Sequence, residues 1–280
     1  MENKKDVVVL IGAGAIGMAI ARRIGVGKHI VVADFKKHNI RVAEEILENS
    51  GFEVSGFVVD ISSKEKIQAL INFSLLKGNI KHVIHAAGVS PSQASIEDIL
   101  KVDLYGTAVI LEEFGKNIAK NGSGVVISSQ SGHRLEALTK KEQDRLLAMT
   151  DVEKLLNLDF ISQIDDTLKA YQFSKRGNSL RVKAQAIEWA KQGARLNTIS
   201  PGIIMTPLAK DELNGERKEF YRNMLENIPA GRVGIADEVA ELAELLLTSK
   251  GSFITGSDFL IDGGATASYF YGPLQPIKED

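Results

Sequence analysis

The sequence predicts an α/β fold, a single domain around a doubly wound parallel sheet. Two observations carry this prediction: short β-branched runs alternate with longer segments of helical period, and the runs are apolar on both faces. Strands of that kind are typical of parallel sheets that helices cover on both sides. No repeat, low-complexity tract or Pro/Gly/Ser-rich linker divides the chain, so residues 1–280 are expected to form one domain.

Seven segments have the pattern of buried strands, namely residues 7–11, 30–33, 53–59, 82–85, 124–128, 194–199 and 259–261. Six longer segments have the apolar period of helices, namely residues 16–24, 39–49, 63–77, 96–120, 167–192 and 236–248. Residues 133–166 break the alternation because they contain no strand. Capping-box patterns at 139–142 and 150–153 predict two short helices in this helical insertion.

Composition excludes several classes of function. Lys and Arg number 34 against 36 Asp and Glu, and the net charge of −2 gives no field that would recruit nucleic acid or an acidic membrane. The chain has no cysteine, which rules out thiolate catalysis, cysteine-ligated zinc and iron–sulfur clusters. No group of His, Asp and Glu has the spacing of metal ligands. We therefore expect no metal, and a borrowed organic cofactor for redox chemistry.

The N-terminal apolar run is short and interrupted by glycine, which does not fit a signal peptide. No stretch approaches the ~20 apolar residues of a membrane helix. We therefore expect a soluble, cytoplasmic protein.

A glycine-rich loop follows the first predicted strand. Gly12, Gly14 and Gly17 have the spacing Gly-x-Gly-x-x-Gly, with Ile16 before the last glycine. The first glycine permits a tight turn, the second lets backbone N–H groups approach a pyrophosphate, and the third lets the next helix pack on the strand. A turn without a ligand would show the same spacing, but the strand–loop–helix–strand order favours a Rossmann-type dinucleotide site.

An acidic residue ends the second predicted strand. Asp34 is placed to accept hydrogen bonds from the adenosine ribose and to repel a 2′-phosphate. A helix cap or a turn would also explain it. Lys36 and Lys37 could hold a 2′-phosphate, but they follow the strand tip, where solvated charges are common. The sequence therefore favours NAD(H) over NADP(H).

A tyrosine and a lysine lie four residues apart in a segment with helical period. Tyr171 and Lys175 therefore share one helix face, although a pair at this spacing arises readily by chance. Ser128 and Ser129 end the fifth predicted strand, at the carboxyl edge where open α/β sheets bind their ligands.

Further motifs follow in order along the chain. They are Asp60–Ile61, Ala86–Ala87–Gly88, residues 127–132, residues 197–202 with Thr206, residues 231–240, residues 253–256 and residues 262–264. Together with the glycine loop and Tyr-x-x-x-Lys, these motifs resemble the short-chain dehydrogenase/reductase family over nearly the whole chain.

The resemblance implies a role for each matching residue. Tyr171 would exchange a proton with the substrate oxygen while hydride moves to or from the nicotinamide. A tyrosine is a poor base at neutral pH, so the cation of Lys175 would be needed to favour phenolate, and it would also hold the nicotinamide ribose. Ser129, rather than Ser128, would orient the substrate oxygen. The remaining matches would surround the cofactor: Gly12, Gly14, Ile16, Gly17, Asp34, Asp60, Ile61, Ala86, Ala87, Gly88, Pro201, Gly202, Ile203 and Thr206.

The chain departs from the family pattern in three places. Its glycine loop is one residue shorter than the usual Thr-Gly-x-x-x-Gly-x-Gly. Asp103 stands where the family has an asparagine of the proton relay, and an ionised aspartate accepts hydrogen bonds but donates none. An ordinary helix-surface or capping acid is the alternative. The insertion at 133–166 separates Ser129 from Tyr171, and it either walls the substrate pocket or decorates the surface.

Residues 205–228 resemble the mobile substrate lid of the family, and the aromatic tail at 267–273 is expected to dock on another subunit. The function predicted is an NAD(H)-dependent oxidoreductase, a homodimer or homotetramer, which interconverts a secondary alcohol and a ketone on a small or medium organic substrate. The alternative is a regulatory protein that senses NAD(H) without turnover. Asp103 and the altered loop would suit that alternative, whereas Ser129, Tyr171 and Lys175 argue against it.

Overall fold

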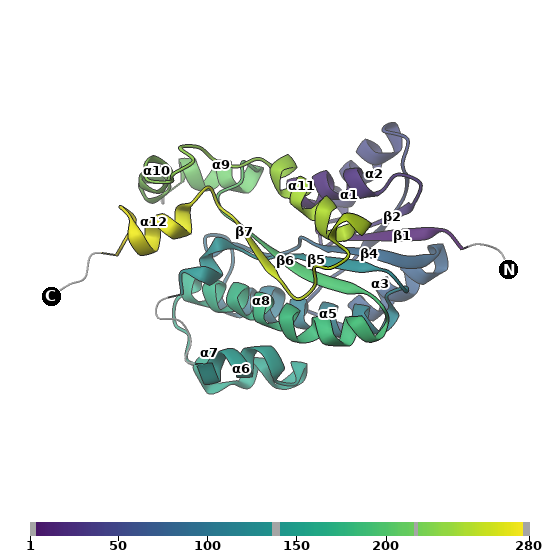
Figure 1. Ribbon diagram of the computed structural model, residues 1–280, viewed down its shortest axis with the longest axis horizontal. Coiled ribbons are helices and arrows are strands. Elements are labelled where there is room, and N and C mark those ends of the chain that lie inside the picture. Colours follow the sequence, from purple (N-terminus) through teal and green to yellow (C-terminus); the bar gives the residue numbers. More distant parts are fainter. Residues whose placement is uncertain (1–3, 136–140, 216–217, 277–280) are drawn as a thin grey trace.

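Seven parallel strands form one sheet in the computed structural model, which describes residues 4–135, 141–215 and 218–276. The spatial order is β3-β2-β1-β4-β5-β6-β7, so the predicted doubly wound parallel sheet is confirmed (Figure 1). The strands are β1 (Asp6–Ile11), β2 (His29–Asp34), β3 (Glu53–Val58), β4 (Asn79–His85), β5 (Ser123–Ile127), β6 (Arg195–Pro201) and β7 (Asp258–Ile261).

Helices cover both faces of the sheet (Figure 1). One face carries α1 (Ala15–Ile24), α2 (Lys37–Asn49) and α11 (Ala236–Leu247), and the other carries α3 (Lys64–Lys77), α5 (Thr107–Asn117) and α8 (Thr167–Lys191). Successive side chains of a strand point to opposite faces. Leu10 of β1 therefore packs in one apolar core, whereas its neighbours Val9 and Ile11 pack in the other.

The predicted helix at 96–120 is continuous from Ile96 to Asn117, but its middle has π-helical geometry that the sequence did not predict. It consists of α4 (Ile96–Ile99), a π-helix over Leu100–Gly106, and α5, which ends at Asn117. The π-helix surrounds Asp103, whose carboxylate accepts a hydrogen bond from the Val89 N–H at 2.9 Å. π-helical turns inside α-helices are rare and are frequently found at functional sites.

The insertion at 133–166 forms an outer layer beneath α8, on the side away from the sheet (Figure 1). Its described elements are α6 (Lys141–Met149), a 3₁₀ helix over Val152–Asn157 and α7 (Asp159–Ser162). The first predicted capping box, at 139–142, begins outside the described residues. The second was wrong in its cap: the side chain of Asp151, not that of Thr150, accepts the Glu153 N–H at 3.0 Å and starts the 3₁₀ helix.

Two polar contacts hold this outer layer on α8. Arg176 forms an ion pair with Asp144 of α6 at 2.6 Å. The Arg181 guanidinium donates hydrogen bonds to the carbonyl oxygens of Leu147 and Thr150, each at 3.0 Å. Arginine thereby caps the C-terminal end of α6, where helix carbonyls lack partners within the helix.

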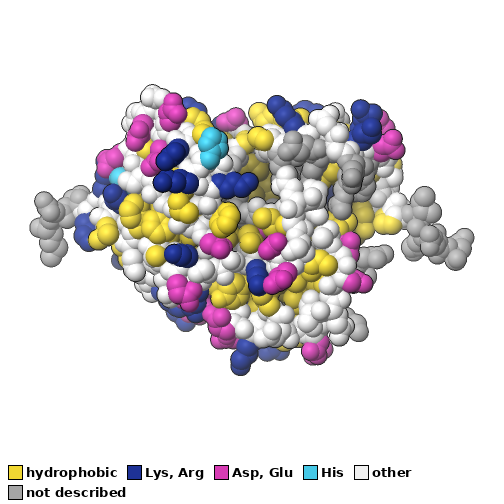
Figure 2. Space-filling view, turned by 180° about the vertical axis from the view of Figure 1, so that it is seen from behind, with side chains coloured by type: hydrophobic (Ala, Val, Ile, Leu, Met, Phe, Trp, Pro, Cys, Tyr) yellow, Lys and Arg dark blue, Asp and Glu magenta, His cyan; other side chains and the backbone are white. Residues whose placement is uncertain are grey.

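The predicted lid forms α9 (Pro207–Asn214) and α10 (Lys218–Glu226), and these lie beside α12 (Ala265–Tyr271) at one end of the molecule (Figure 1). Positive and negative side chains are interspersed over the face seen in Figure 2. None of the helices in the described part of the chain is long and apolar enough to cross a membrane.

Candidate active site

The glycine loop meets the end of β4 where the strand order of the sheet reverses. Ala86 N–H donates to the Ile11 carbonyl, and Gly12 N–H donates to the Ala33 carbonyl, both at 2.8 Å. Gly12 has a φ of 96°, and a Cβ there would lie 2.4 Å from the Ala87 nitrogen. Only glycine fits this turn, as the sequence predicted. In open α/β sheets, such a reversal is where ligands bind.

The other two glycines have the surroundings that a dinucleotide site needs, one open and one tightly packed. A Cβ on Gly14, at the N-terminal end of α1, would meet nothing within 4 Å. A Cβ on Gly17 would lie 2.4 Å from the Gly12 carbonyl oxygen, so this glycine lets α1 pack tightly on the loop. The loop therefore offers an open side at a helix N-terminus, a site that fits a pyrophosphate.

Asp34 lies at the tip of β2 against the glycine loop. Its Oδ2 accepts the Ala13 N–H at 2.9 Å, and its Oδ1 accepts the Lys36 N–H at 2.8 Å and the Asn39 amide at 3.1 Å. The carboxylate is thus fixed beside the loop, and it also has the turn-forming role that the sequence left open. On the neighbouring strand, Asp60 follows β3 and accepts hydrogen bonds from the N–H and hydroxyl of Ser62.

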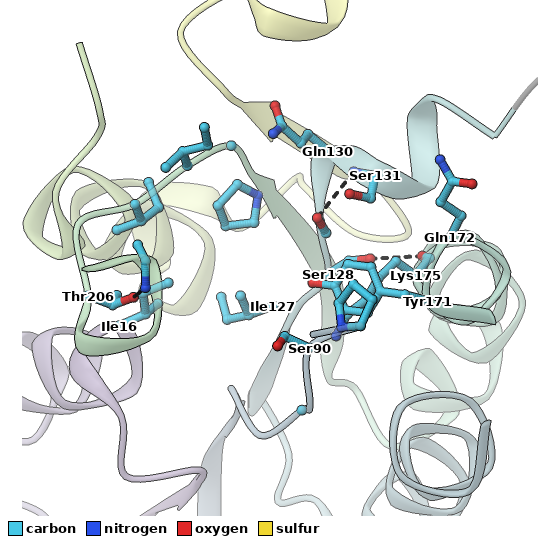
Figure 3. A pocket seen from close by; sticks show the side chains of 18 of the residues that line it. Ile16, Ser90, Ile127, Ser128, Gln130, Ser131, Tyr171, Gln172, Lys175 and Thr206 are labelled. Carbon is cyan, nitrogen blue, oxygen red and sulfur yellow. Dashed lines mark hydrogen bonds between the residues drawn. The ribbon is translucent and has the colours of Figure 1, made fainter. Parts of the chain in front are cut away.

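A cavity of about 660 Å³ joins this edge of the sheet to the Tyr-x-x-x-Lys helix. Figure 3 shows Ile16 and Thr206 on one side of it, and Ser128, Tyr171 and Lys175 on the other. The predicted site residues that line the cavity are Ile16, Ala86, Ala87, Gly88, Ser129, Tyr171, Lys175, Pro201, Gly202, Ile203 and Thr206. The predicted residues outside its lining are Gly12, Gly14, Gly17, Asp34, Asp60, Ile61 and Asp103.

Lys175 lies buried beneath Tyr171 on α8. Its Nζ is 5.1 Å from the centre of the Tyr171 ring and 3.2 Å from Oδ2 of Asp103. Both members of this ion pair are buried, at 5% and 1% exposure. A Cβ on Gly88 would lie 3.1 Å from both Lys175 Nζ and Asp103 Oδ1, so the glycine allows the loop after β4 to cover the pair.

Burial and pairing act in opposite directions on these two groups. Burial lowers the pKa of Lys175, but the Asp103 carboxylate and Tyr171 outweigh it and hold that pKa above its usual value. Burial raises the pKa of Asp103, and the Lys175 cation opposes this shift. Sequence reasoning placed Asp103 in a proton relay but missed its ion pair with Lys175. The only signal was a carboxylate where the family has an amide.

The two serines at the end of β5 make different hydrogen bonds. The Ser128 hydroxyl donates to the Lys175 carbonyl at 2.8 Å and is buried. The Ser129 hydroxyl oxygen accepts the Ser131 N–H at 3.1 Å and lines the cavity. Ser128 thus ties the strand to α8, whereas the hydroxyl proton of Ser129 remains available to a substrate oxygen.

The histidines near the cavity have structural roles, as predicted. His85 Nε2 lies 2.8 Å from the Thr107 hydroxyl, and burial together with the Lys175 charge lowers the pKa of His85 to about 3. His133 pairs with Asp258 at 2.9 Å. Within the described residues, no group of three His, Asp or Glu side chains could hold a metal ion.

Sequence reasoning missed two of the side chains that line this cavity, those of Arg134 and Tyr269, whereas Met224 belongs to the lid that it predicted at 205–228. Arg134, Met224 and Tyr269 line it and come from segments distant in the chain, so no spacing could have linked them. Tyr269, in the tail expected to dock on another subunit, packs its ring 5.6 Å from the guanidinium carbon of Arg134 in its own chain. Of the described residues in the insertion at 133–166, only Arg134 lines the cavity, so the other described residues of that segment do not wall it.

Known proteins are similar to this chain both in sequence and in architecture. A profile of the family described as enoyl-(acyl carrier protein) reductase matches residues 12–142 and 137–266. Short-chain dehydrogenase/reductase bsc3 of Alternaria brassicicola is 39% identical over 94% of this chain and 96% of its own length. D-threitol dehydrogenase of Mycolicibacterium smegmatis is 27% identical, over 94% and 93%.

Solved structures agree with the fold. The crystal structure of gox2181 matches with a TM-score of 0.75 at 24% identity, over 95% of this chain and 96% of that one. A variant of the actinorhodin polyketide ketoreductase, solved with NADPH, matches with a TM-score of 0.73 at 22% identity, over 94% and 98%. The chain belongs to the short-chain dehydrogenase/reductase family. It is therefore an oxidoreductase of alcohol and ketone groups that uses a nicotinamide cofactor.

Proposed function

We propose that this protein is an NAD(H)-dependent oxidoreductase that interconverts a secondary alcohol and a ketone on a small or medium organic substrate. The observation that carries the proposal is the position of Tyr171 over the buried Lys175 cation, in the same cavity as Ser129. When bound, the nicotinamide supplies or accepts the hydride. The glycine loop with Asp34 and Asp60 would hold the adenosine end of the cofactor. The nicotinamide end would be held by the predicted cofactor residues that line the cavity, namely Ile16, Ala86, Ala87, Gly88, Pro201, Gly202, Ile203 and Thr206.

The side chains of the cavity account for the proton. In ketone reduction, the Tyr171 hydroxyl donates a proton to the substrate oxygen, and in alcohol oxidation the phenolate accepts it. Lys175 stabilises the phenolate because an adjacent cation favours the charged form. Ser129 donates a hydrogen bond to the same substrate oxygen and orients it. Asp103 acts through Lys175, which it holds in place and partly neutralises.

Replacement of the tyrosine tests this assignment. Tyr171→Phe removes the proton donor, and we expect turnover to fall by about 10²- to 10⁴-fold while NADH binding persists. Tyr105→Phe is the matched control, since Tyr105 contacts Glu153 on the surface. Rates come from NADH absorbance over a screen of alcohols and ketones, and binding from NADH fluorescence. An unchanged rate in Tyr171→Phe, with any accepted substrate, would disprove the role of this residue.

The preference for NAD(H) is a second part of the proposal and rests on Asp34. Its carboxylate is fixed beside the glycine loop, where a 2′-phosphate would meet a negative charge. Asp34→Asn keeps the size and an acceptor oxygen but removes the charge. We expect the ratio of kcat/KM for NADH over NADPH to fall about tenfold or more, since one charge contact is worth ~1.5–3 kcal/mol.

Glu48→Gln serves as the control for this cofactor test, because it makes the same change from carboxylate to amide at an exposed position of α2. Its cofactor ratio should equal that of the wild type. A wild-type enzyme that prefers NADPH would contradict our interpretation of Asp34.

One observation favours the alternative of an NAD(H)-sensing regulatory protein. The Asp103 carboxylate offsets part of the Lys175 charge on which Tyr171 depends, so turnover could be weak. The screen of alcohols and ketones separates the two functions when it is run beside an NADH titration. Binding without turnover of any substrate would favour the sensor, and turnover would exclude a purely regulatory role.

Assembly and location complete the proposal. We infer a homodimer or homotetramer located in the cytoplasm, acting on small molecules without a nucleic-acid partner. Large apolar side chains at the surface support assembly: Phe253 is fully exposed and Tyr271 is 90% exposed. Light scattering after size exclusion gives the mass in solution, and a value of one chain would contradict this inference.

A further inference from the structure

Arg134 carries a positive charge at the lining of the cavity. It follows the 3₁₀ helix over Gln130–His133 and lines the same cavity as Ser129 and Tyr171. Among the described residues that line this cavity, the charged side chains are Arg134 and Lys175, and none is a carboxylate. Lys175 already has Asp103 as its partner. The charge of Arg134 therefore has no counterion within the lining.

The groups around the guanidinium are neutral. Its Nη2 donates to the Gln130 side-chain oxygen at 2.6 Å. The sulfur of Met224, a weak acceptor, lies 3.6 Å from Nη1, and the ring of Tyr269 lies 5.6 Å from the guanidinium carbon. The Nε–H is buried and has no hydrogen-bond partner among the residues that the structure describes. A guanidinium has five N–H donors, so this one has donors in excess of its acceptors.

Asp262, the carboxylate whose charge acts on Arg134, is occupied elsewhere. Burial lowers the pKa of Arg134, and the Asp262 charge opposes that shift through space. However, Asp262 accepts the N–H groups of Gly264 and Thr266, at 2.9 and 2.7 Å, and forms no ion pair with Arg134 among the described contacts. Because arginine stays protonated, a partly buried and unpaired guanidinium is costly unless a ligand supplies the anion.

Other arginines of the chain show what a structural role looks like here. Arg176 and Arg232 form ion pairs with Asp144 and Glu238, each at 2.6 Å. Arg195 donates hydrogen bonds to four backbone carbonyls. Within the described part of the chain Arg134 has neither kind of partner, and it lines the cavity in which the reaction would occur.

We propose that Arg134 binds an anionic oxygen group of the substrate, a carboxylate or a phosphate, in the part of the cavity lined by Met224 and Tyr269. The inference rests on the proposed function in that it places this group on the alcohol or ketone that reacts at Tyr171. The planar guanidinium suits either group, because its N–H donors match pairs of anionic oxygens. The apolar residues of the cavity lining would hold the carbon chain of the substrate.

A binding experiment tests the site without requiring turnover. Hexanoate, hexyl phosphate and hexanamide are titrated by calorimetry into the protein saturated with NAD⁺. We expect an anionic probe to bind about 10- to 100-fold tighter than the neutral amide, as one hydrogen-bonded charge contact predicts. Arg134→Met should abolish this difference and leave the amide unchanged. Preference for hexanoate assigns a carboxylate, and preference for hexyl phosphate assigns a phosphate ester.

Two further variants serve as controls for the calorimetric titration. Arg222→Met removes an exposed arginine of α10 and should keep the wild-type preference. Arg134→Gln replaces the methionine variant if circular dichroism shows that Arg134→Met does not fold, and the same loss is expected. Equal affinity for all three probes, or a preference that survives both Arg134 variants, overturns the proposal.

A turnover assay distinguishes failure of the anion site at Arg134 from failure of the proposed oxidoreductase function. Hydroxyhexanoates and matched hydroxyhexanamides are assayed with NAD⁺, and Arg134→Met should lower kcat/KM for the acids alone. Turnover of the amides at rates equal to those of the acids refutes the anion site and leaves the oxidoreductase assignment intact. Anion binding with no turnover of any substrate would instead refute the proposed function and support the site.

Discussion

Asp103 is one of the three places at which this chain departs from the pattern of its family. Its carboxylate accepts the Val89 N–H through Oδ1 and pairs with Lys175 through Oδ2, within a π-helical turn. An asparagine could keep the first contact but would bring no charge to the second. The carboxylate therefore reduces the net charge that stabilises the Tyr171 phenolate, which a negative neighbour disfavours.

Removal of that charge should change the pH dependence of the reaction. Asp103→Asn leaves Lys175 as an unbalanced cation beside Tyr171, so phenolate should form at lower pH. We expect the pH profile of kcat/KM for alcohol oxidation to shift towards acid by on the order of one unit. The exposed Asp98 offers a control, since Asp98→Asn should leave the profile unchanged. A shift towards alkaline pH, or no shift, would contradict this account of Asp103.

The residues of the site were predicted to different extents. The glycine loop could be predicted because the spacing of Gly12, Gly14 and Gly17 between a strand and a helix is a local pattern, although the contact of Gly12 with Ala87 is not local. Arg134 escaped prediction because its partners Gln130, Met224 and Tyr269 include residues far away in the chain. No local spacing encodes such a contact.

At the scale of elements, α8 connects the insertion, the site and the core. It carries Tyr171 and Lys175 on the cavity side, and Arg176 and Arg181 towards the insertion. Near its C-terminal end, Trp189 is 1% exposed and donates to the Leu111 carbonyl at 2.9 Å. The position of this one helix thus determines both the site and the packing beneath it.

Packing of the insertion on α8 should contribute measurably to stability. Leu147 of α6 is fully buried, whereas Leu146 beside it is 38% exposed. Leu147→Ala should lower the free energy of unfolding by about 2–5 kcal/mol, because it removes buried methyl groups and leaves a cavity. Leu146→Ala, the matched control, should cost under about 1 kcal/mol. Urea denaturation measures both, and equal losses would show that α6 does not pack on α8 in solution.

At the scale of the whole molecule, the sheet joins two apolar cores into one unit. β1 contributes alternate residues to both cores, so neither core can form without the sheet. This arrangement supports the single-domain prediction for residues 1–280.

Unfolding tests the single domain directly. Trp189 is the one tryptophan of the chain, and it is buried between Gly115 and Gly124. Its fluorescence should therefore report loss of the core, while far-ultraviolet circular dichroism reports loss of all helices and strands. We expect the two signals to change together at one urea midpoint. Separate midpoints would indicate two units that unfold independently.

The sequence by itself determined the parallel sheet, the glycine loop and the alignment of Tyr171 with Lys175, because periodicity and short spacings encode local geometry. The tertiary structure alone decided the π-helical geometry around Asp103, the ion pair beneath Tyr171 and the position of the insertion under α8. It also placed Arg134 in the lining of the cavity. These features depend on contacts between residues far apart in the chain, and such contacts exist only once the sheet has brought its strands together.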